Sequence, residues 1–336
     1  MKRFGNLWES VVSFENLRIA ALEASKAKRQ SAPVQNFLFN LEPNIINLQN
    51  QLITSEYKPG AYSYFTIYEP KERKICAAPF VDRVVHHAVC RVMDPSLERI
   101  YVPQSYACRT NKGMHKAIDK AQGYLRSSKY FLKCDIEKFF DSVDHEVLKS
   151  CLRLKFKDKQ LLELLDKIID HPVPGNPTGR GLPIGNLTSQ HFANFLLTGM
   201  DIKILEEIRP EGYVRYMDDF VLFVDDKSKL HEAKRIIRNY LFENLRLKLK
   251  LKGSFIAPGY HGLPFLGFQI FPSIKRLKRA NWIRFTRKFK ESYNAFETGL
   301  INETTLIRST ASLFGHIRHA DTLTLRQKFC ESFTWH

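Results

Sequence analysis

The 336-residue sequence predicts an α+β protein built from antiparallel strands and helices. Two apolar runs, at 213–216 and 220–224, are rich in aromatic and β-branched residues, and so few residues separate them that a tight turn must join them. A third apolar run, at 130–134, also has the composition of a buried strand. Helical patterns occupy much of the remaining sequence, and a chain of this length is expected to divide into two or three subdomains.

The composition is that of a folded and strongly basic protein. Hydrophobic residues make up 44% of the chain, and 52 Lys and Arg residues against 35 Asp and Glu residues give a net charge of +17. This excess of cations favours polyanionic partners, first nucleic acid and second an anionic membrane surface. No stretch approaches the roughly 20 apolar residues of a membrane-spanning helix, so we expect no membrane partner.

Cysteine usage and the N-terminal residues predict a cytoplasmic protein. The six cysteines are scattered without a C-x-x-C pair, which argues against zinc and for free thiols in a reducing compartment. Residues 1–6 run into amphipathic sequence and lack the apolar core of a signal peptide.

Helices are predicted where apolar residues recur at helical spacing. Asp144 is well placed to cap the N-terminus of the helix that follows it. In one helix, four apolar residues are expected to share a buried face: Val81, Val84, Val85 and Ala88. The predicted helical segments are 6–30, 45–52, 80–89, 114–125, 145–154, a long segment after 190, 231–244, and the chain from 274 onward.

A cationic segment follows the strand-like run at 64–68. Lys71, Arg73 and Lys74 lie close together at a predicted turn between strands. An isolated cluster of this kind is most often a solvated loop. It is also suited to clamp a triphosphate, because Arg can bind phosphate oxygens through two parallel hydrogen bonds.

Three aspartates are the candidate catalytic residues. Asp218 and Asp219 lie in the turn between two apolar runs, and Asp135 directly follows the run at 130–134. Adjacent carboxylates repel each other and favour protonation or a nearby cation, so a turn that carries two of them is a poor choice for stability alone. An ordinary solvated turn is the alternative for the isolated pair.

The chemistry that these aspartates suggest is two-metal catalysis. If the strands that carry them lie side by side, their acidic ends meet at one edge of a sheet. Hard carboxylate oxygens suit Mg²⁺, which pairs carboxylates with substrate phosphates. Two Mg²⁺ ions about 4 Å apart would activate a primer 3′-hydroxyl and stabilise the departing pyrophosphate in an in-line displacement.

A loop with two glycines is predicted at 180–190, after a proline-rich segment at 172–177. Gly181 and Gly185 allow the backbone to approach a ligand closely, and the helix that follows offers free N–H groups at its N-terminus. The alternative is a structural loop in front of a core helix.

The C-terminal third is predicted to contain further strands and then a basic helical region. Residues 245–252 alternate strictly between Leu and a cation, which predicts a strand with one apolar and one cationic face. Residues 263–270 form another turn-and-strand unit. In the helical region, Trp282, Phe285 and Phe289 share a face and are expected to be core contacts, while the cations remain free to meet phosphates.

In this order, these segments resemble a reverse transcriptase. The resemblance covers residues 60–272 and implies the right-hand polymerase architecture, with fingers, a palm made of an antiparallel sheet plus helices, and a helical thumb. The matching features are the cations at 71–74, Asp135 with Phe140, the loop at 185–190, the turn at 216–220, the lysine alternation, and residues 266–268. The implied domains are an N-terminal helical extension at 1–60, fingers at 61–125 with part of 155–190, a palm at 126–272, and a thumb at 273–336.

The resemblance implies a metal site that holds two Mg²⁺ ions. Asp135 matches the first metal-binding aspartate, and Asp218 and Asp219 match the pair in the polymerase turn, where Asp218 is the firmer ligand. The implied metal-binding set also includes Ile136. The three aspartates are the implied catalytic residues.

The resemblance also implies contacts with the substrates. Phe140 matches the aromatic gate that disfavours a ribose 2′-hydroxyl. Lys248 or Lys250 matches the motif that assists the leaving pyrophosphate, and spacing does not choose between them. Leu266 and Gly267 resemble the primer grip. The implied dNTP-binding residues are Lys71, Arg73, Phe140, Ile184, Gly185 and Gln190. The implied partners are template RNA, the RNA/cDNA duplex and dNTP substrates.

One departure from the common pattern narrows the resemblance. Most relatives have Gln-Gly and Ser-Pro where this chain has Ile184-Gly185 and Ser189-Gln190. These replacements, with the tail at 315–322, look like the reverse transcriptases of diversity-generating retroelements, which are bacterial, archaeal or phage-encoded. Such enzymes copy a template-repeat RNA into cDNA with frequent errors opposite adenine for mutagenic retrohoming, together with a small basic oligomeric accessory protein.

Three alternatives to this subtype stay open. The chain also resembles group II intron-like enzymes and retron or defence-type reverse transcriptases, although residues 263–267 lack the Val-Thr-Gly signature of retrons. From another class, it is similar to a catalytically idle RNA-binding protein that kept the polymerase fold. Phe140 disfavours an RNA-dependent RNA polymerase, because that activity needs space for the 2′-hydroxyl.

Overall fold

The computed structural model describes residues 3–26, 28–68, 72–173 and 175–332. The chain forms two compact units. Unit 1 comprises Met1–Arg109, Ile136–Glu207 and Arg235–Lys250, and unit 2 comprises Thr110–Asp135, Ile208–Lys234 and Leu251–His336.

Unit 1 begins with helices that pack on one another. The predicted helix at 6–30 is two helices, because Ser13 leaves the helical conformation and its hydroxyl caps the second one, accepting a hydrogen bond from Asn16 N at 3.3 Å. Val84, Val85 and Ala88 are buried as predicted, but Val81 is 37% exposed and lies outside that apolar face. The helices are α1 (Trp8–Val12), α2 (Phe14–Ala24), α3 (Ala32–Phe39), α4 (Leu41–Ile53) and α5 (Phe80–Glu98).

A two-stranded hairpin follows α4 in the sequence. Strands β1 (Ser63–Ile67) and β2 (Arg73–Ala77) pair antiparallel, with Phe65 opposite Ile75 and Ile67 opposite Arg73. All five residues of β1 are exposed. The strand predicted at 64–68 is confirmed with bounds one residue earlier, and the burial in this hairpin lies in β2, where Cys76 is buried.

The remaining helices of unit 1 precede and follow the predicted glycine loop in the sequence. Asp144 caps α8 as predicted, accepting a hydrogen bond from Val147 N at 3.2 Å, and it also pairs with Arg246 Nη1 at 3.0 Å. The helices are α7 (Phe139–Ser142), α8 (His145–Lys155), α9 (Lys159–Ile169), α10 (Leu187–Leu196) and α11 (Thr198–Lys203), followed by a π-helical turn (Ile204–Ile208). The helix α12 (Lys227–Leu245) begins in unit 2 and ends in unit 1.

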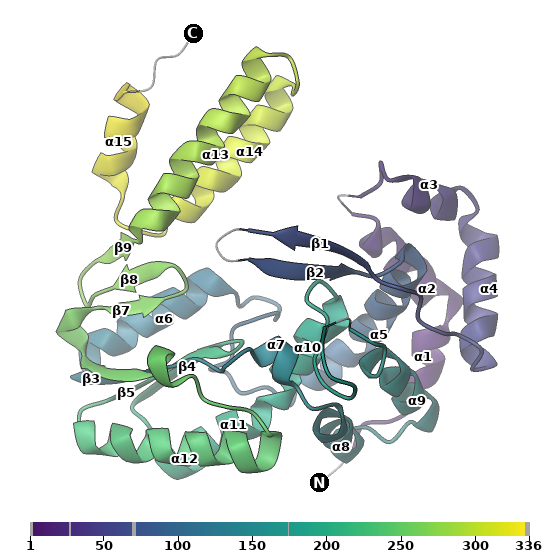
Figure 1. Ribbon diagram of the computed structural model, residues 1–336, viewed down its shortest axis with the longest axis horizontal. Helices are drawn as coiled ribbons and strands as arrows, with labels where there is room; N and C mark the ends of the chain where they lie inside the picture. The colour runs from purple at the N-terminus through teal and green to yellow at the C-terminus, as the bar shows by residue number, and fades with distance from the viewer. Residues whose placement is uncertain (1–2, 27, 69–71, 174, 333–336) are drawn as a thin grey trace. The chain divides into compact units, whose positions relative to one another are not determined.

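Unit 2 is organised around a four-stranded antiparallel sheet in the order β4-β5-β3-β6 (Figure 1). Its central strands carry the apolar runs predicted as strands, and their side chains form much of the core because both faces are covered. Gly212 leaves room for the ring of Tyr124, which packs against Phe223 at a centroid distance of 5.4 Å. The elements are α6 (Met114–Ser127), β3 (Tyr130–Cys134), β4 (Gly212–Tyr216), β5 (Asp219–Val224) and β6 (Phe255–Pro258).

A small three-stranded sheet and three helices complete unit 2 (Figure 1). The chain from 274 onward was predicted to be helical, but its first residues form β9, which pairs with β8. Phe285 and Phe289 are buried against Phe314 and Phe329, which confirms the prediction for these two rings. Trp282 stacks on Phe285 at a centroid distance of 5.1 Å but is only half-buried. The elements are β7 (Leu263–Phe265), β8 (Phe268–Ile270), β9 (Lys275–Leu277), α13 (Arg279–Glu297), α14 (Glu303–Ile317) and α15 (Leu323–Ser332).

The predicted strand at 245–252 is wrong. Leu247 and Leu249 are buried, so the alternation of burial holds that far, but the segment makes a single bridge, from Leu249 to Ile136. Arg246 has a φ of +56°, which breaks the extended conformation, and a 3₁₀ turn occupies Leu251–Gly253. Alternating burial alone does not supply a neighbouring strand to pair with.

The fold class is confirmed as α+β with antiparallel sheets and many helices. Within the described residues, no helix is long and apolar enough to cross a membrane. The domain boundaries inferred from the sequence stay a prediction, because the two compact units divide the chain by a different criterion.

The turn between β4 and β5 has an unusual backbone. Tyr216 pairs with Asp219, so the loop consists of two residues, Met217 and Asp218. Met217 has a φ of +55°, and a single positive φ at the first loop position is the pattern of a type II′ turn, where glycine is the usual residue. A methionine in this conformation stores strain at the tip of the hairpin.

We expect Met217→Gly to be more stable than Met217→Ala by about 1 kcal/mol, because both lack the methionine side chain and only alanine keeps the Cβ that opposes a left-handed backbone. The free energies of unfolding of the two variants can be compared by urea denaturation. Equal stabilities would show that the turn stores no strain at this position.

Candidate active site

The three predicted catalytic aspartates lie at one edge of the unit 2 sheet. Cys134, the last residue of β3, pairs with Phe220 of β5, so the next position on each strand brings Asp135 toward Asp219. Asp218 precedes Asp219 in the turn. Because directly opposed residues share a face of the sheet, the register places Asp135 and Asp219 on the same face. The register therefore brings the strand ends that carry Asp135 and Asp219 to one edge of the sheet, whereas the catalytic and metal-binding roles of the aspartates stay predictions.

Asp219 lies in a partly buried environment with charged neighbours. Burial raises the pKa of its carboxyl, the Lys133 ammonium opposes this shift, and the negative charge of Asp135 adds to it. The Lys133 Nζ lies 2.7 Å from Asp219 Oδ1, and the exposed fractions of the two side chains are only 13% and 24%. Asp135 donates its backbone N–H to Ser254 Oγ at 3.3 Å, which fixes the backbone where the carboxylate leaves β3.

Arg215 supports the acidic turn from the other face of the sheet. Its side chain is fully buried in β4, and its Nη1 donates a hydrogen bond to the carbonyl of Met217 at 3.3 Å. Arg215 lies opposite Phe220 in the ladder, whereas Lys133 lies opposite Val221. The turn is therefore held through a backbone carbonyl by one cation and through a carboxylate by another.

The donor set at this edge fits Mg²⁺. All three side chains offer hard carboxylate oxygens, and Mg²⁺ in nucleotide-processing sites takes one or two carboxylates plus substrate phosphates rather than a cage of protein ligands. No three His, Cys, Asp or Glu side chains in the described part of the chain are grouped closely enough to hold a metal ion by themselves, so the metal-binding role of the three aspartates stays a prediction. Ile136 has a buried side chain, so only its backbone carbonyl could serve a metal.

The predicted primer-grip residues form the turn of the β7–β8 hairpin. Phe265 pairs with Phe268, which leaves Leu266 and Gly267 as a two-residue loop with φ angles of +48° and +88°. Two positive φ angles are the pattern of a type I′ turn. Asn281 Nδ2 of α13 donates to the Gly267 carbonyl at 2.9 Å, so the first turn of that helix is tied to this loop.

In unit 1, the glycine loop lies against the β1–β2 hairpin. The Ile184 carbonyl accepts a hydrogen bond from Cys76 N at 2.8 Å, which joins the loop to β2. Gly185 has a φ of +125°, and a Cβ there would meet the Cys76 carbonyl oxygen at 2.6 Å. The close contact between the loop and β2 therefore requires glycine at position 185. The sequence alone did not reveal this contact.

Other predicted dNTP-binding residues lie on the same segments of unit 1. Leu182 of the loop donates its N–H to the Phe140 carbonyl at 2.7 Å, so the predicted aromatic gate adjoins the loop. Arg73 is exposed on β2, whereas Lys71 lies outside the described residues. Gln190 is exposed on α10 and accepts a hydrogen bond from Cys108 Sγ at 3.3 Å. The dNTP-binding roles themselves stay predictions.

The two candidate leaving-group lysines lie on an extended segment of unit 1. The Lys248 carbonyl accepts a hydrogen bond from Glu137 N at 2.9 Å, and the Lys248 side chain is exposed. Lys250 is half-buried, one residue beyond the bridge of Leu249 to Ile136. The structure does not choose between them.

Sequence reasoning missed two cations that contact the acidic turn and its flanking strand. Lys133 and Arg215 each interrupt an otherwise apolar strand, and that interruption is the signal that could have identified them. A long cation inside a buried strand requires a partner, and here each partner lies within the β4–β5 hairpin.

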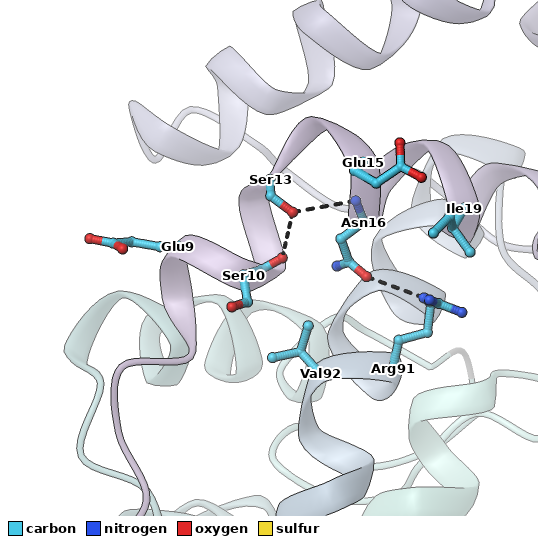
Figure 2. A pocket seen from close by; sticks show the side chains of 8 residues that line it. All are labelled: Glu9, Ser10, Ser13, Glu15, Asn16, Ile19, Arg91 and Val92. Carbon is cyan, nitrogen blue, oxygen red and sulfur yellow. Dashed lines mark hydrogen bonds between the residues drawn. The ribbon is translucent and has the colours of Figure 1, made fainter.

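A shallow depression on unit 1 is formed by residues of α1, α2 and α5, and Figure 2 shows its lining side chains. Their polar atoms are engaged with one another: Ser13 Oγ donates to the Ser10 carbonyl at 3.0 Å, and Arg91 Nε donates to Asn16 Oδ1 at 3.2 Å (Figure 2). None of the residues predicted to be functional lines this depression. The contacts of these residues are those of packing between helices.

We expect Gly185→Ala to lower the free energy of unfolding by about 2–3 kcal/mol, since the new Cβ would collide with the β2 backbone as well as strain φ. Gly175→Ala is the matched control, because Gly175 also has a positive φ, of +94°, but a Cβ there meets nothing within 4 Å. Urea denaturation of both variants measures the difference. Equal losses would contradict the steric role of the Cys76 carbonyl.

Curated relatives of this chain are proteins encoded by bacteria and by introns. The chain is 24% identical over 266 residues to "Protein YkfC" of Escherichia coli (strain K12), covering 66% of this chain and 70% of that protein. It is 22% identical over 287 residues to "Group II intron-encoded protein LtrA" of Lactococcus lactis subsp. cremoris, covering 66% of this chain and 47% of that protein. The chain thus spans about half the length of LtrA.

Among solved structures, the chain is similar in fold to apo telomerase from Candida tropicalis truncated from its C-terminal domain. The similarity covers 68% of this chain and 59% of that chain, with 15% sequence identity and a TM-score of 0.50. At this level of identity the likeness concerns the fold alone.

The decisive comparison is with protein families. The family described as reverse transcriptase (RNA-dependent DNA polymerase) matches residues 59–270, which is more than half of the chain. The match contains all three aspartates, the turns of the β4–β5 and β7–β8 hairpins, and the glycine loop. The resemblance inferred from the motifs extended over nearly the same residues. The chain belongs to the reverse transcriptase family.

Proposed function

We propose that this protein is an RNA-directed DNA polymerase. The observation that carries the proposal is the meeting of Asp135, Asp218 and Asp219 at one edge of an antiparallel sheet, in a chain of the reverse transcriptase family. A family relative that had lost catalysis would have no need to keep two aspartates at a strained turn with a third beside them, because the charge of Asp135 disfavours the ionised form of Asp219.

The proposed roles follow from the contacts at the sheet edge. Asp135 and Asp218 present carboxylate oxygens, and Asp219 presents the oxygen that Lys133 does not bind. When bound there, two Mg²⁺ ions would activate the primer 3′-hydroxyl and neutralise charge on the leaving pyrophosphate. Arg215 keeps the turn in register by holding the Met217 carbonyl.

The substrates and partners proposed are a template RNA, the RNA/cDNA duplex and dNTPs. The net charge of +17 supports a polyanionic partner. Exposed Arg73 on β2, the aromatic Phe140 and the loop with Ile184 and Gly185 are the proposed dNTP contacts, and Lys248 or Lys250 the proposed aid to the leaving group. Leu266 and Gly267 are proposed to steady the primer end.

For the biological role, we propose copying of a template-repeat RNA with frequent errors at adenine, as in diversity-generating retroelements. The support for this role is the resemblance to that subtype at Ile184, in the loop against β2, and at Gln190. This role would bring a small basic oligomeric accessory protein as a partner. A group II intron-like role is the second candidate, because LtrA is a group II intron-encoded protein.

The polymerase proposal predicts that the protein extends a DNA primer on an RNA template with dNTPs and Mg²⁺. Asp218→Ala is expected to lower the rate of extension by at least about 1,000-fold, because it removes a carboxylate proposed to bind the Mg²⁺ ions that stabilise the transition state. The measurement is single-nucleotide primer extension on a denaturing gel.

Asp226→Ala is the matched control for this assay. Asp226 is likewise a loop aspartate next to β5, but it is exposed, and its carboxylate accepts hydrogen bonds from Ser228 N and Oγ, at 2.8 and 2.7 Å. It should extend primers like the unmodified protein. Equal extension by the Asp218→Ala and Asp226→Ala proteins would rule out the proposed chemistry.

The subtype proposal predicts a particular error spectrum. Misincorporation should be concentrated opposite template adenine, and Ile184→Gln should reduce it by about tenfold, since a hydrogen-bonding side chain near the nascent pair restores about 1–2 kcal/mol of discrimination. Sequencing of cDNA made by both proteins on one template measures this. Errors spread evenly over the four bases would favour the group II intron-like role.

A further inference from the structure

Lys133 lies in a strand position that is costly for a cation. It is the fourth residue of β3, the strand between β5 and β6, and its directly opposed neighbours are Val221 and Phe255. The other residues of this strand are aromatic, aliphatic or cysteine. An ammonium group with 13% exposure in such a strand destabilises the fold unless a partner compensates for its lost hydration.

The partner of Lys133 is the carboxylate of Asp219. The two residues share one face of the sheet, because Lys133 is opposite Val221 and Asp219 is two positions before Val221 on β5. The Nζ–Oδ1 distance of 2.7 Å is that of a charge-assisted hydrogen bond. The ladder therefore fixes the base of both side chains, and the ion pair fixes their ends.

We propose that Lys133 serves as an internal counter-ion of the acidic centre. Its ammonium holds one oxygen of Asp219 and balances negative charge at the sheet edge before divalent ions bind. The other oxygen of Asp219 is not bound by Lys133. This inference rests on the proposed polymerase site and assigns a task to a residue outside the aspartate motifs.

The counter-ion role makes a prediction about metal and stability that a purely structural lysine would not. Lys278 also acts electrostatically on Asp219, but Lys133 is the cation hydrogen-bonded to it, so without Lys133 the acidic edge carries one more uncancelled negative charge in the metal-free protein. Bound divalent ions would then supply the missing positive charge. Stabilisation by divalent ions should accordingly be larger in a Lys133→Met variant than in the unmodified protein.

The experiment is a double-mutant cycle of full-length proteins, with melting temperatures measured by calorimetry in EDTA and in MgCl₂. The variants are Lys133→Met, Asp219→Asn and the double mutant, with Lys133→Arg as the charge-conserving control. In EDTA we expect Lys133→Met to lower the Tm by about 5 °C and Lys133→Arg by less than about 2 °C. Lys133→Met should cost little in the Asp219→Asn background, where the charge to be balanced is gone.

A second readout is direct binding of Mn²⁺, followed by electron paramagnetic resonance of the free ion. Lys133→Met should bind Mn²⁺ at least as tightly as the unmodified protein, because it loses a cation that competes for Asp219. Weaker binding, or a Tm loss that is the same in EDTA and MgCl₂, would overturn the counter-ion role. The role would also be overturned if Lys133→Met lowered the Tm equally in the unmodified protein and in the Asp219→Asn variant.

If the single Lys133→Met variant does not fold, the double mutant decides the question. Recovery of a folded protein on adding Asp219→Asn supports the pair, and failure to recover overturns it. None of these measurements uses a template, primer or nucleotide. A negative result here is thus distinguishable from a failure of primer extension, which tests the polymerase proposal itself.

Discussion

The antiparallel register between β3 and β5 is the constraint on which the acidic centre depends. Cys134 opposite Phe220 brings Asp135 and Asp219 to the same edge and face of the sheet. A slip of one residue would turn Asp219 to the opposite face, away from Lys133. The apolar side chains of both strands are buried on both faces, so the packing of the core fixes the register, and the register fixes the site.

Burial of charge near this edge explains why two cations lie inside apolar strands. Lys133 reaches Asp219 on one face, while Arg215 reaches the Met217 carbonyl on the other. Removing either cation would leave a polar group of the turn without its partner in a partly desolvated place, where its cost is larger than at the surface. The β4–β5 hairpin is therefore held from both faces at its tip.

The sequence predicted the strands that have strong apolar runs, and with them the three aspartates. It failed at 245–252, because alternating residues predict which side chains are buried but not whether a strand lies alongside. It also missed β9, whose residues Lys275–Leu277 carry two cations and owe their conformation to pairing with β8. The pairing of Lys133 with Asp219 depends on the register of β3 and β5. The need for Gly185 depends on a contact between the loop and β2, which are far apart in the sequence. Residue patterns contain neither kind of information.

The adjacent aspartates of the turn are held by different means, and this argues for unequal roles. Asp219 is the first residue of β5, so its direction follows the ladder and its ion pair with Lys133. Asp218 is a loop residue, so its direction follows from the left-handed backbone of Met217, whose carbonyl Arg215 holds. A substitution at Met217 or Arg215 should therefore act first through Asp218, whereas one at Lys133 should act first through Asp219.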